Sequence, residues 1–482
     1  MRRTVRAVLA ASLLLSPVAA WSEPVDDAAA KKVEDAVRAF GPDAWSAPGL
    51  LTVRPDGEGY RLVLDTAGAL RPQIAPWTVK NASPLEFRLD ERPDGHWSFD
   101  AAGDLTLSTE YLAANRTNGV TLVLGSKVIR GVFDPVTVFP REAEVGFKDA
   151  ALTLRAAQET IRFGLKDYRL TSAVRDLPDG RGDVDSEFAA QDFTARFGTF
   201  PNPEVRLSAA RIDGTYRLGT FDLAGFGALT RFWQVTAAGK GVSKLTDTER
   251  EEFKALLTRH APFVDEIGGS LVASDLSISQ AGKAFSAKKL DWQSRWEGMG
   301  GRTAMVIGFR VENVAISPDV WPKALEAILP VAAALNIRSS GFDMAATWKE
   351  AAELRTPEEQ ARMPRDPFMK SVLPDGRMTM EITDSFIRSG FYDMSVSGRF
   401  HMVPGEKTKQ ITGALTVSAR DFDGTVKYLQ DNAGTVPVFT RAAFIALMMK
   451  GLGKAEPDGS LVWDVRFEDT GKITVNGQPL PM

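Results

Sequence analysis

The feature that most constrains the fold is the alternation of apolar and charged residues at every second position. In PLEFRLDE, Leu85, Phe87 and Leu89 fall on one side of an extended chain and charged residues fall on the other. TIRFGLKDYRL and LVWDVRF repeat the pattern. A period of two with one charged face is typical of half-buried antiparallel strands. From about residue 50 to residue 233 the sequence therefore predicts almost uninterrupted antiparallel strands, apolar on one face and solvated on the other.

Turn-forming residues separate these segments throughout the chain. Proline presets φ, aspartate can bond its own backbone, and glycine accepts positive φ, so Pro-Asp-Gly favours a tight turn. This tripeptide begins at Pro55, Pro93, Pro178, Pro374 and Pro457. Further tight turns are expected at Asn118-Gly119, Asp213-Gly214, Asp423-Gly424 and Asn476-Gly477. Such frequent turns indicate many strands that are joined locally.

Helical periodicity is confined to a few segments. The sequence predicts helices over residues 26–40, from the capping box of Thr246 and Glu249, over residues 317–335 with a break at Pro330, from Thr356, and over residues 440–450. Charged residues inside 317–335 argue against a membrane span and favour packing on a sheet. The apolar residues 444–449 are expected to fill a core. The predicted fold class is mainly β (α+β), with extended curved antiparallel sheets and a few packed amphipathic helices.

The N-terminus has the pattern of a cleavable secretory signal peptide. Arg2, Arg3 and Arg6 precede a short apolar stretch, and small residues allow cleavage after Ala20 or after Ser22. We expect a signal peptide over residues 1–22 and a periplasmic protein with no stable transmembrane anchor after cleavage. A change in pattern near residue 240 divides the rest into a β-rich N-terminal domain, 23–240, and a C-terminal α+β domain, 241–482, that ends in a β-hairpin.

The composition removes several chemistries. The chain has no cysteine and three histidines, His96, His260 and His401, which lie far apart in the sequence. Thiol nucleophiles, disulfides and Cys-ligated metals are therefore excluded, and neither H-E-x-x-H nor G-x-S-x-G occurs. The acidic stretch 176–187 lacks the register of an EF-hand loop and is interpreted as a hairpin tip. The sequence thus nominates no catalytic, cofactor-binding or metal-binding residue and no cofactor, and it favours a protein that is not an enzyme.

The charge balance also bears on partners. The chain has 58 Lys and Arg against 62 Asp and Glu, and the two signs are well mixed. No basic stripe with interleaved aromatic residues occurs, so nucleic acid is not an expected partner.

The C-terminal phrase resembles a bacterial envelope family. Gly471, Ile473, Val475, Asn476 and Gly477 fit a "G-x-[IL]-x-[VL]-N-G" ending that resembles the AsmA-like and YdgA-like domains of unknown function. The segment from Leu256 to Ser279, a helix followed by Ala-Pro and strands, is similar as well. The resemblance implies an exported protein rich in long antiparallel sheet and brings no catalytic residues. The cleaved leader departs from the family, whose members usually keep an N-terminal anchor.

Together these observations lead to one main hypothesis of function. We expect a non-catalytic exported envelope protein whose apolar sheet face shelters a lipid or another hydrophobic ligand, because the few helices cannot cover that face. The alternative is a structural or interaction module that pairs with another envelope protein. An unrecognised hydrolase is the third reading.

Overall fold

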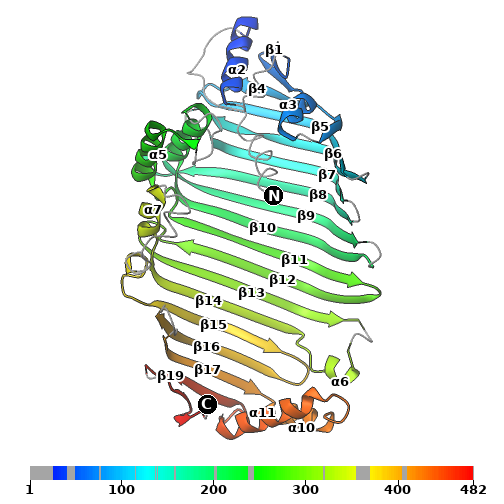
Figure 1. Ribbon diagram of the computed structural model, residues 1–482, viewed down its shortest axis with the longest axis vertical. Coiled ribbons are helices and arrows are strands. Elements are labelled where there is room, and N and C mark those ends of the chain that lie inside the picture. The colour runs from blue at the N-terminus through cyan, green and yellow to red at the C-terminus, as the bar shows by residue number, and fades with distance from the viewer. Residues whose placement is uncertain are drawn as a thin grey trace. The chain divides into compact units, whose positions relative to one another are not determined.

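The computed structural model describes most of the chain after residue 24. The described residues are 25–40, 49–74, 77–113, 116–135, 137, 139–156, 159–199, 203–236, 244–317, 321–353, 370–403, 410–469 and 471–480. The expected signal peptide and the helix expected from Thr356 lie outside them. The fold is mainly β, with curved antiparallel sheet and a few helices (Figure 1), which confirms the predicted fold class.

The structure separates into two compact units. The first contains Met1–Ile267 and Trp348–Met363, and the second contains Gly268–Thr347 and Pro364–Met482. The division after Ile267 lies later than the domain boundary near residue 240 that the sequence suggests. The reason is that the helix beginning at Asp247 packs, through Phe253, against Phe232 of the first unit.

The first unit is an antiparallel ladder of strands with helices around it. Its strands are β1 Leu51–Asp56, β2 Gly59–Leu64, β3 Thr78–Ala82, β4 Leu85–Glu91, β5 Trp97–Ala113, β6 Arg116–Asp134, β7 Phe139–Ala156, β8 Glu159–Asp176, β9 Arg181–Thr199 and β10 Val205–Asp222. They pair in the order β1–β2–β4–β5–β6–β7–β8–β9–β10, and β3 pairs with β5 beyond the end of β4. Its helices are α2 Asp27–Phe40, α3 Thr66–Ile74, α4 Leu223–Arg231, the π-helix η3 Phe232–Thr236 and α5 Asp247–His260; η2 Pro178–Gly180 is a 3-10 turn.

The cores of this unit lie where helices meet strands. The apolar stripe of α2, with Ala30, Val33 and Val37, packs on Leu51 and Leu62 of the first strands. The predicted capping box of α5 is present, because the side chains of Thr246 and Glu249 each bond the other residue's backbone.

The second unit repeats the antiparallel pattern. Its strands are β11 Glu266–Gln280, which begins two residues before the unit, β12 Lys283–Glu297, β13 Arg302–Ile316, β14 Ala332–Asp343, β15 Met378–Arg388, β16 Asp393–Val403, β17 Gln410–Arg420, β18 Lys454–Ala455, β19 Leu461–Phe467, β20 Ile473–Val475 and β21 Gln478–Pro479. From β12 onward they pair in the order β12–β13–β14–β15–β16–β17–β19–β20–β21, with β18 also on β19. Its helices are α6 Lys323–Glu326, α10 Phe422–Asp431 and α11 Val438–Leu452; α7 Met344–Ala352 crosses between the units.

The expected turns have a mixed outcome. All five Pro-Asp-Gly glycines adopt positive φ, which confirms the turn prediction there; they are Gly57, Gly95, Gly180, Gly376 and Gly459. Of the four dipeptides, only Asn476-Gly477 forms a turn with positive φ at both residues. Asn118-Gly119 and Asp213-Gly214 lie inside β6 and β10, and Asp423-Gly424 lies inside α10, so those three turn predictions are wrong.

The helix expected over residues 317–335 is also largely wrong. Among the described residues of this stretch, only the four of α6 are helical, and β14 already begins at Ala332. Pro330 prevents the helix from continuing, and the apolar residues after it pair with β13 and β15 on both sides. None of the helices among the described residues is long and apolar enough to cross a bilayer.

Candidate functional site

An uncovered row of large apolar side chains crosses the second unit. Trp292 on β12 pairs in register with Phe309 on β13, which pairs with Leu335 on β14. Cross-strand partners point to the same face, so these three side chains stand side by side. They are 42%, 40% and 45% exposed. Ile307 and Ile387 continue the same surface in the neighbouring register positions and are also exposed. We call this surface the apolar face.

The sequence builds the apolar face by alternation. Residues 289, 291, 293 and 295 of β12 are charged or polar, whereas Leu290 and Trp292 between them are apolar. The charged residues lie on the opposite face and pair there, as Lys289 does with Asp291 at 2.9 Å and Arg310 with Glu312 at 2.5 Å. The two faces of these strands therefore differ sharply in chemistry.

The described helices of the second unit pack elsewhere. Helices α6, α10 and α11 form one apolar cluster around Leu429 and Phe439. A second cluster joins α10 and α11 to the last strands through Trp463 and Val475. In Figure 1, α10 and α11 lie at the β17–β19 end of this unit, and no described helix lies over β12–β14. The large exposed fractions of Trp292, Phe309 and Leu335 follow from this arrangement.

The first unit carries a related surface of aromatic side chains. Phe147 on β7 stacks on Tyr168 on β8 with ring centroids 4.6 Å apart, and Tyr168 lies 6.4 Å from Phe188 on β9. Burial among these rings raises the pKa of Tyr168. A second pair, Phe163 and Phe197, meets edge to face at 5.9 Å. Aromatic cross-strand pairs stabilise the sheet and give its face an apolar lining.

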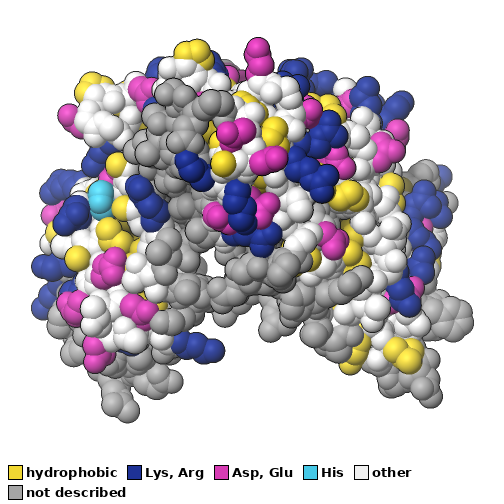
Figure 2. Space-filling view, turned by 90° about the horizontal axis from the view of Figure 1, so that it is seen from above, with side chains coloured by type: hydrophobic (Ala, Val, Ile, Leu, Met, Phe, Trp, Pro, Cys, Tyr) yellow, Lys and Arg dark blue, Asp and Glu magenta, His cyan; other side chains and the backbone are white. Residues whose placement is uncertain are grey.

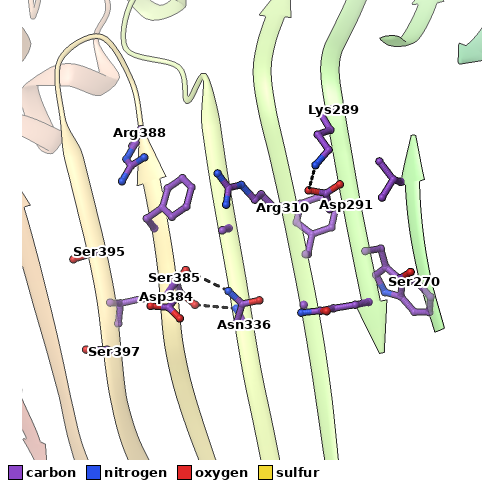
Figure 3. A pocket seen from close by; sticks show the side chains of 18 residues that line it. Ser270, Lys289, Asp291, Arg310, Asn336, Asp384, Ser385, Arg388, Ser395 and Ser397 are labelled. Atoms are coloured by element: carbon purple, nitrogen blue, oxygen red, sulfur yellow. Dashed lines mark hydrogen bonds and ion pairs between the residues drawn. The ribbon is translucent and has the colours of Figure 1, made fainter. Parts of the chain in front are cut away.

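A shallow hollow of about 760 Å³ lies across β11–β16; residues of the charged face line most of it, and Trp292 and Phe309 also border it. Figure 3 shows charged and polar side chains along its walls. Several of its charges are paired: Lys289 bonds Asp291, and Arg388 bonds Asp393 at 2.9 Å while lying 4.2 Å from the ring of Phe386. The Ser385 hydroxyl accepts a hydrogen bond from the backbone N–H of Asn336 and donates to a carbonyl. Both hydrogen bonds of the Ser385 hydroxyl are therefore made with the backbone of the sheet.

The three histidines each have a local partner. Nδ1 of His96 lies 3.1 Å from Asp94, Nδ1 of His260 lies 2.8 Å from Asp222, and Nδ1 of His401 lies 2.9 Å from Thr379. Asp222 also caps α4 by accepting the backbone N–H of Gly225. Within the described part of the chain, no group of three or more His, Asp or Glu side chains is arranged to hold a metal ion.

The acidic stretch 176–187 forms the β8–β9 hairpin around η2. Its carboxylates bond arginines: Asp176 bonds Arg141 at 2.6 Å, and Asp183 bonds Arg217 at 2.9 Å and also Arg175. Asp183 is buried, unlike the solvated tip that the sequence suggests. The hydrogen bond from the backbone N–H of Thr220 lowers the pKa of Asp183; burial works against this, and the two arginines add to it. These contacts brace the hairpin against the end of β10.

The structure also corrects the expectation for the apolar residues 444–449. Met449 packs inside, but Phe444, Ile445, Leu447 and Met448 are exposed on the outer side of α11. The core-filling prediction is thus wrong for four of these residues. The sequence contained a sign of this exposure. Apolar residues occur on all sides of α11, but a helix that packs on one surface has only one side covered.

Charges on the surface are interspersed. Figure 2 shows Lys and Arg side chains alternating with Asp and Glu over the visible described surface, without a large area of one sign. Cross-strand ion pairs account for part of this mixture; Glu144, for example, lies between Arg130 and Arg169.

Comparison with known proteins identifies no relative. No protein-family model matches the sequence, and no curated protein or solved structure gives a significant match.

Proposed function

We propose that this protein is a non-catalytic component of the bacterial envelope, exported to the periplasm, that shelters a lipid or another hydrophobic ligand on its apolar face. The observation that carries the proposal is the in-register row of Trp292, Phe309 and Leu335, which the described helices leave exposed. A surface of this kind in water favours a bound apolar partner. The C-terminal phrase from Gly471 to Gly477 supports placement near the AsmA-like and YdgA-like families.

The form of the row suits an acyl chain. Neighbouring strands lie about 4.8 Å apart, so side chains in one register row follow one another as a continuous track across the sheet. Each methylene that leaves water contributes about 0.8 kcal/mol. A long aliphatic chain laid along the row would gain from several strands at once. On the opposite face, Lys289 pairs with Asp291 and Arg310 with Glu312, so that surface is polar.

The proposal is tested on the full chain expressed with its own N-terminus. Protein purified without detergent is analysed by native mass spectrometry and by organic extraction. We expect stoichiometric phospholipid or fatty acid, and we expect the Phe309→Ser/Leu335→Asn variant to lose most of it. The matched control is Ser397→Asn, an exposed change on the polar face of β16. It should keep the ligand.

Two results would count against the proposal. A wild-type protein that is free of lipid would favour the interaction-module alternative and direct the work to crosslinking of envelope partners. Equal lipid content in the wild type and the apolar-face variant would place the ligand elsewhere.

A further inference from the structure

Helix α11 is apolar on two opposite sides, and only one of them is covered. Its inner side buries Phe439 and Ala443 against α6 and α10. Its outer side exposes five large apolar side chains, each by 45–64%: Val438, Phe444, Ile445, Leu447 and Met448. We call these five residues the outer patch. It is separate from the apolar face, because it belongs to a helix that packs at the β17–β19 end of the unit.

The charges of α11 are of one sign. Over its 15 residues the helix contains no Asp or Glu, and its charged residues are Arg441 and Lys450, both exposed. Arg441 lies three residues after Val438 and four before Ile445, so it emerges within the outer patch. It has no ion-pair partner among the described residues. Lys450, one turn beyond the patch, bonds Asp423 of α10 at 2.6 Å.

The C-terminal end of the helix is held by hydrogen bonds to the last strands. The backbone carbonyl of Met449 accepts a hydrogen bond from the indole of Trp463 at 2.6 Å, and that of Leu452 accepts one from the side chain of Asn476 at 2.7 Å. The outer patch cannot turn inward without breaking these bonds. Its exposure is therefore a property of the folded unit.

From these observations we propose that the outer patch of α11 docks the protein on the surface of a membrane that contains anionic lipid. An exposed apolar helical face can insert into the boundary between headgroups and acyl chains, where a basic residue within it, here Arg441, meets anionic headgroups. Arg441 can extend its aliphatic stem along the patch and place its guanidinium at the headgroups. A second copy of the protein is a poorer occupant, because a contact between two outer patches would bring the two Arg441 guanidiniums together with no carboxylate on either α11 helix.

The absence of cysteine permits a site-specific test. Ile445→Cys is labelled with an environment-sensitive nitrobenzoxadiazole fluorophore and mixed with vesicles of phosphatidylethanolamine containing about one quarter phosphatidylglycerol. We expect a blue-shifted, severalfold brighter emission, and a much smaller change with phosphatidylcholine vesicles. The matched control is Leu112→Cys on β5, because Leu112 is 67% exposed, similar to the 64% of Phe444, but lies in the first unit. Its label should not respond.

Vesicle flotation of unlabelled protein gives the second readout. We expect Phe444→Gln/Met448→Gln to reduce the floated fraction about tenfold and Arg441→Gln to reduce its dependence on phosphatidylglycerol, while Leu112→Gln floats like the wild type. All three variants change exposed side chains, and their thermal melts establish that they are folded.

Three results would overturn the proposal. They are a silent label at residue 445, flotation that the Phe444→Gln/Met448→Gln variant retains, and a concentration-dependent dimer that this variant abolishes. The docking proposal does not rest on a ligand at the apolar face. If lipid co-purifies but the label at residue 445 does not respond, docking is refuted and the sheltering proposal stands. If the label responds but no lipid co-purifies, the sheltering proposal is refuted and docking stands.

Discussion

The indole N–H of Trp463 on β19 donates a hydrogen bond to the backbone carbonyl oxygen of Met449 on α11 across 2.6 Å. Trp463 is 2% exposed, and its ring meets that of Phe422 edge to face at 5.2 Å. A Cβ at Gly453, just after the helix, would lie 3.1 Å from the indole nitrogen, so the chain leaves α11 closely against the ring. One side chain therefore joins the last helix to the last long strand.

Replacing Trp463 should separate packing from hydrogen bonding. Trp463→Phe keeps an aromatic ring but removes the bond to Met449, and we expect it to lower the free energy of unfolding by about 1 kcal/mol. Trp463→Ala also leaves a cavity and should cost about 3–5 kcal/mol. Urea denaturation followed by circular dichroism measures both losses. Equal losses in the two variants would mean that the ring itself contributes little.

Asn476 lies in the turn of the C-terminal hairpin. It stabilises this turn through its side-chain hydrogen bonds and through its tolerance of positive φ, and two variants can measure these effects separately. Its side chain donates to the carbonyls of Leu452 and Val462 and accepts the backbone N–H of Asp464, while its φ is 50°. Asn476→Gly loses the side-chain bonds but tolerates this φ, and we expect a cost of about 2 kcal/mol. Asn476→Ala adds about 1 kcal/mol of left-handed strain. A glycine variant less stable than the alanine variant would contradict this account.

Asp183 should make stability depend on acid pH. Because the folded state lowers the pKa of its carboxyl, mainly through the N–H of Thr220, its contribution is fully present above the unfolded pKa of about 3.9 and is lost as pH falls through the folded pKa. Asp183→Asn removes the carboxylate that Arg175 and Arg217 share, although Arg217 keeps Asp185 at 2.9 Å, and it should cost about 2 kcal/mol near neutral pH. The difference from the wild type should shrink below about pH 4 in a series of urea melts. A difference that is constant down to pH 2 would exclude the linkage.

Lys127 should make stability depend on pH in the alkaline range. Its side chain is buried and donates to the carbonyl of Ala102 at 2.9 Å. Burial lowers its pKa, although the carboxylates of Glu86 and Asp104 act against this. The unfolded chain thus binds the proton more tightly, so stability should rise with pH between the folded pKa and about 10.4. Lys127→Met should abolish that rise.

At neutral pH the same variant removes the cost of burying a charge, and we expect it to stabilise the first unit by about 1 kcal/mol. Thermal melts at neutral and alkaline pH measure both effects. A Lys127→Met variant that is destabilised at neutral pH would show that the bond to Ala102 outweighs the cost of burial.

The sequence predicted local structure best where two signals agreed. Alternation together with Pro-Asp-Gly located most strands of the first unit and five turns, because positive φ at Gly57 or Gly180 serves a hairpin in any context, but it missed α3 and α4 within residues 50–233. Asp213-Gly214 carries the same local chemistry, but its flanking residues pair with β9 on both sides of the dipeptide, and the ladder prevails over the turn. The helix expected through Leu335 failed for a similar reason: an apolar run without alternation suits a strand between two others as well as a helix.

The candidate surfaces were only partly predictable. Alternation indicated that an apolar face would exist, but not which rows would stay exposed, since that depends on where α10 and α11 pack. The exposure of Phe444 was missed because an apolar helix is usually buried. Trp292, Phe309 and Leu335 form one row because of the register between β12, β13 and β14, and the sequence does not reveal that register.

The strand ladder of the first unit has a consequence for how it unfolds. Each of β6, β7, β8 and β9 pairs with its two neighbours alone. The free energy of unfolding of this ladder is then close to a sum of interactions between neighbouring strands, as in linear repeat proteins. Such a ladder can open one strand at a time, so cooperativity extends over only a few strands. Amide hydrogens should exchange most slowly in β1 and β2, where α2 buries the strands, and faster along β6–β9, whereas a single cooperative core would give one plateau.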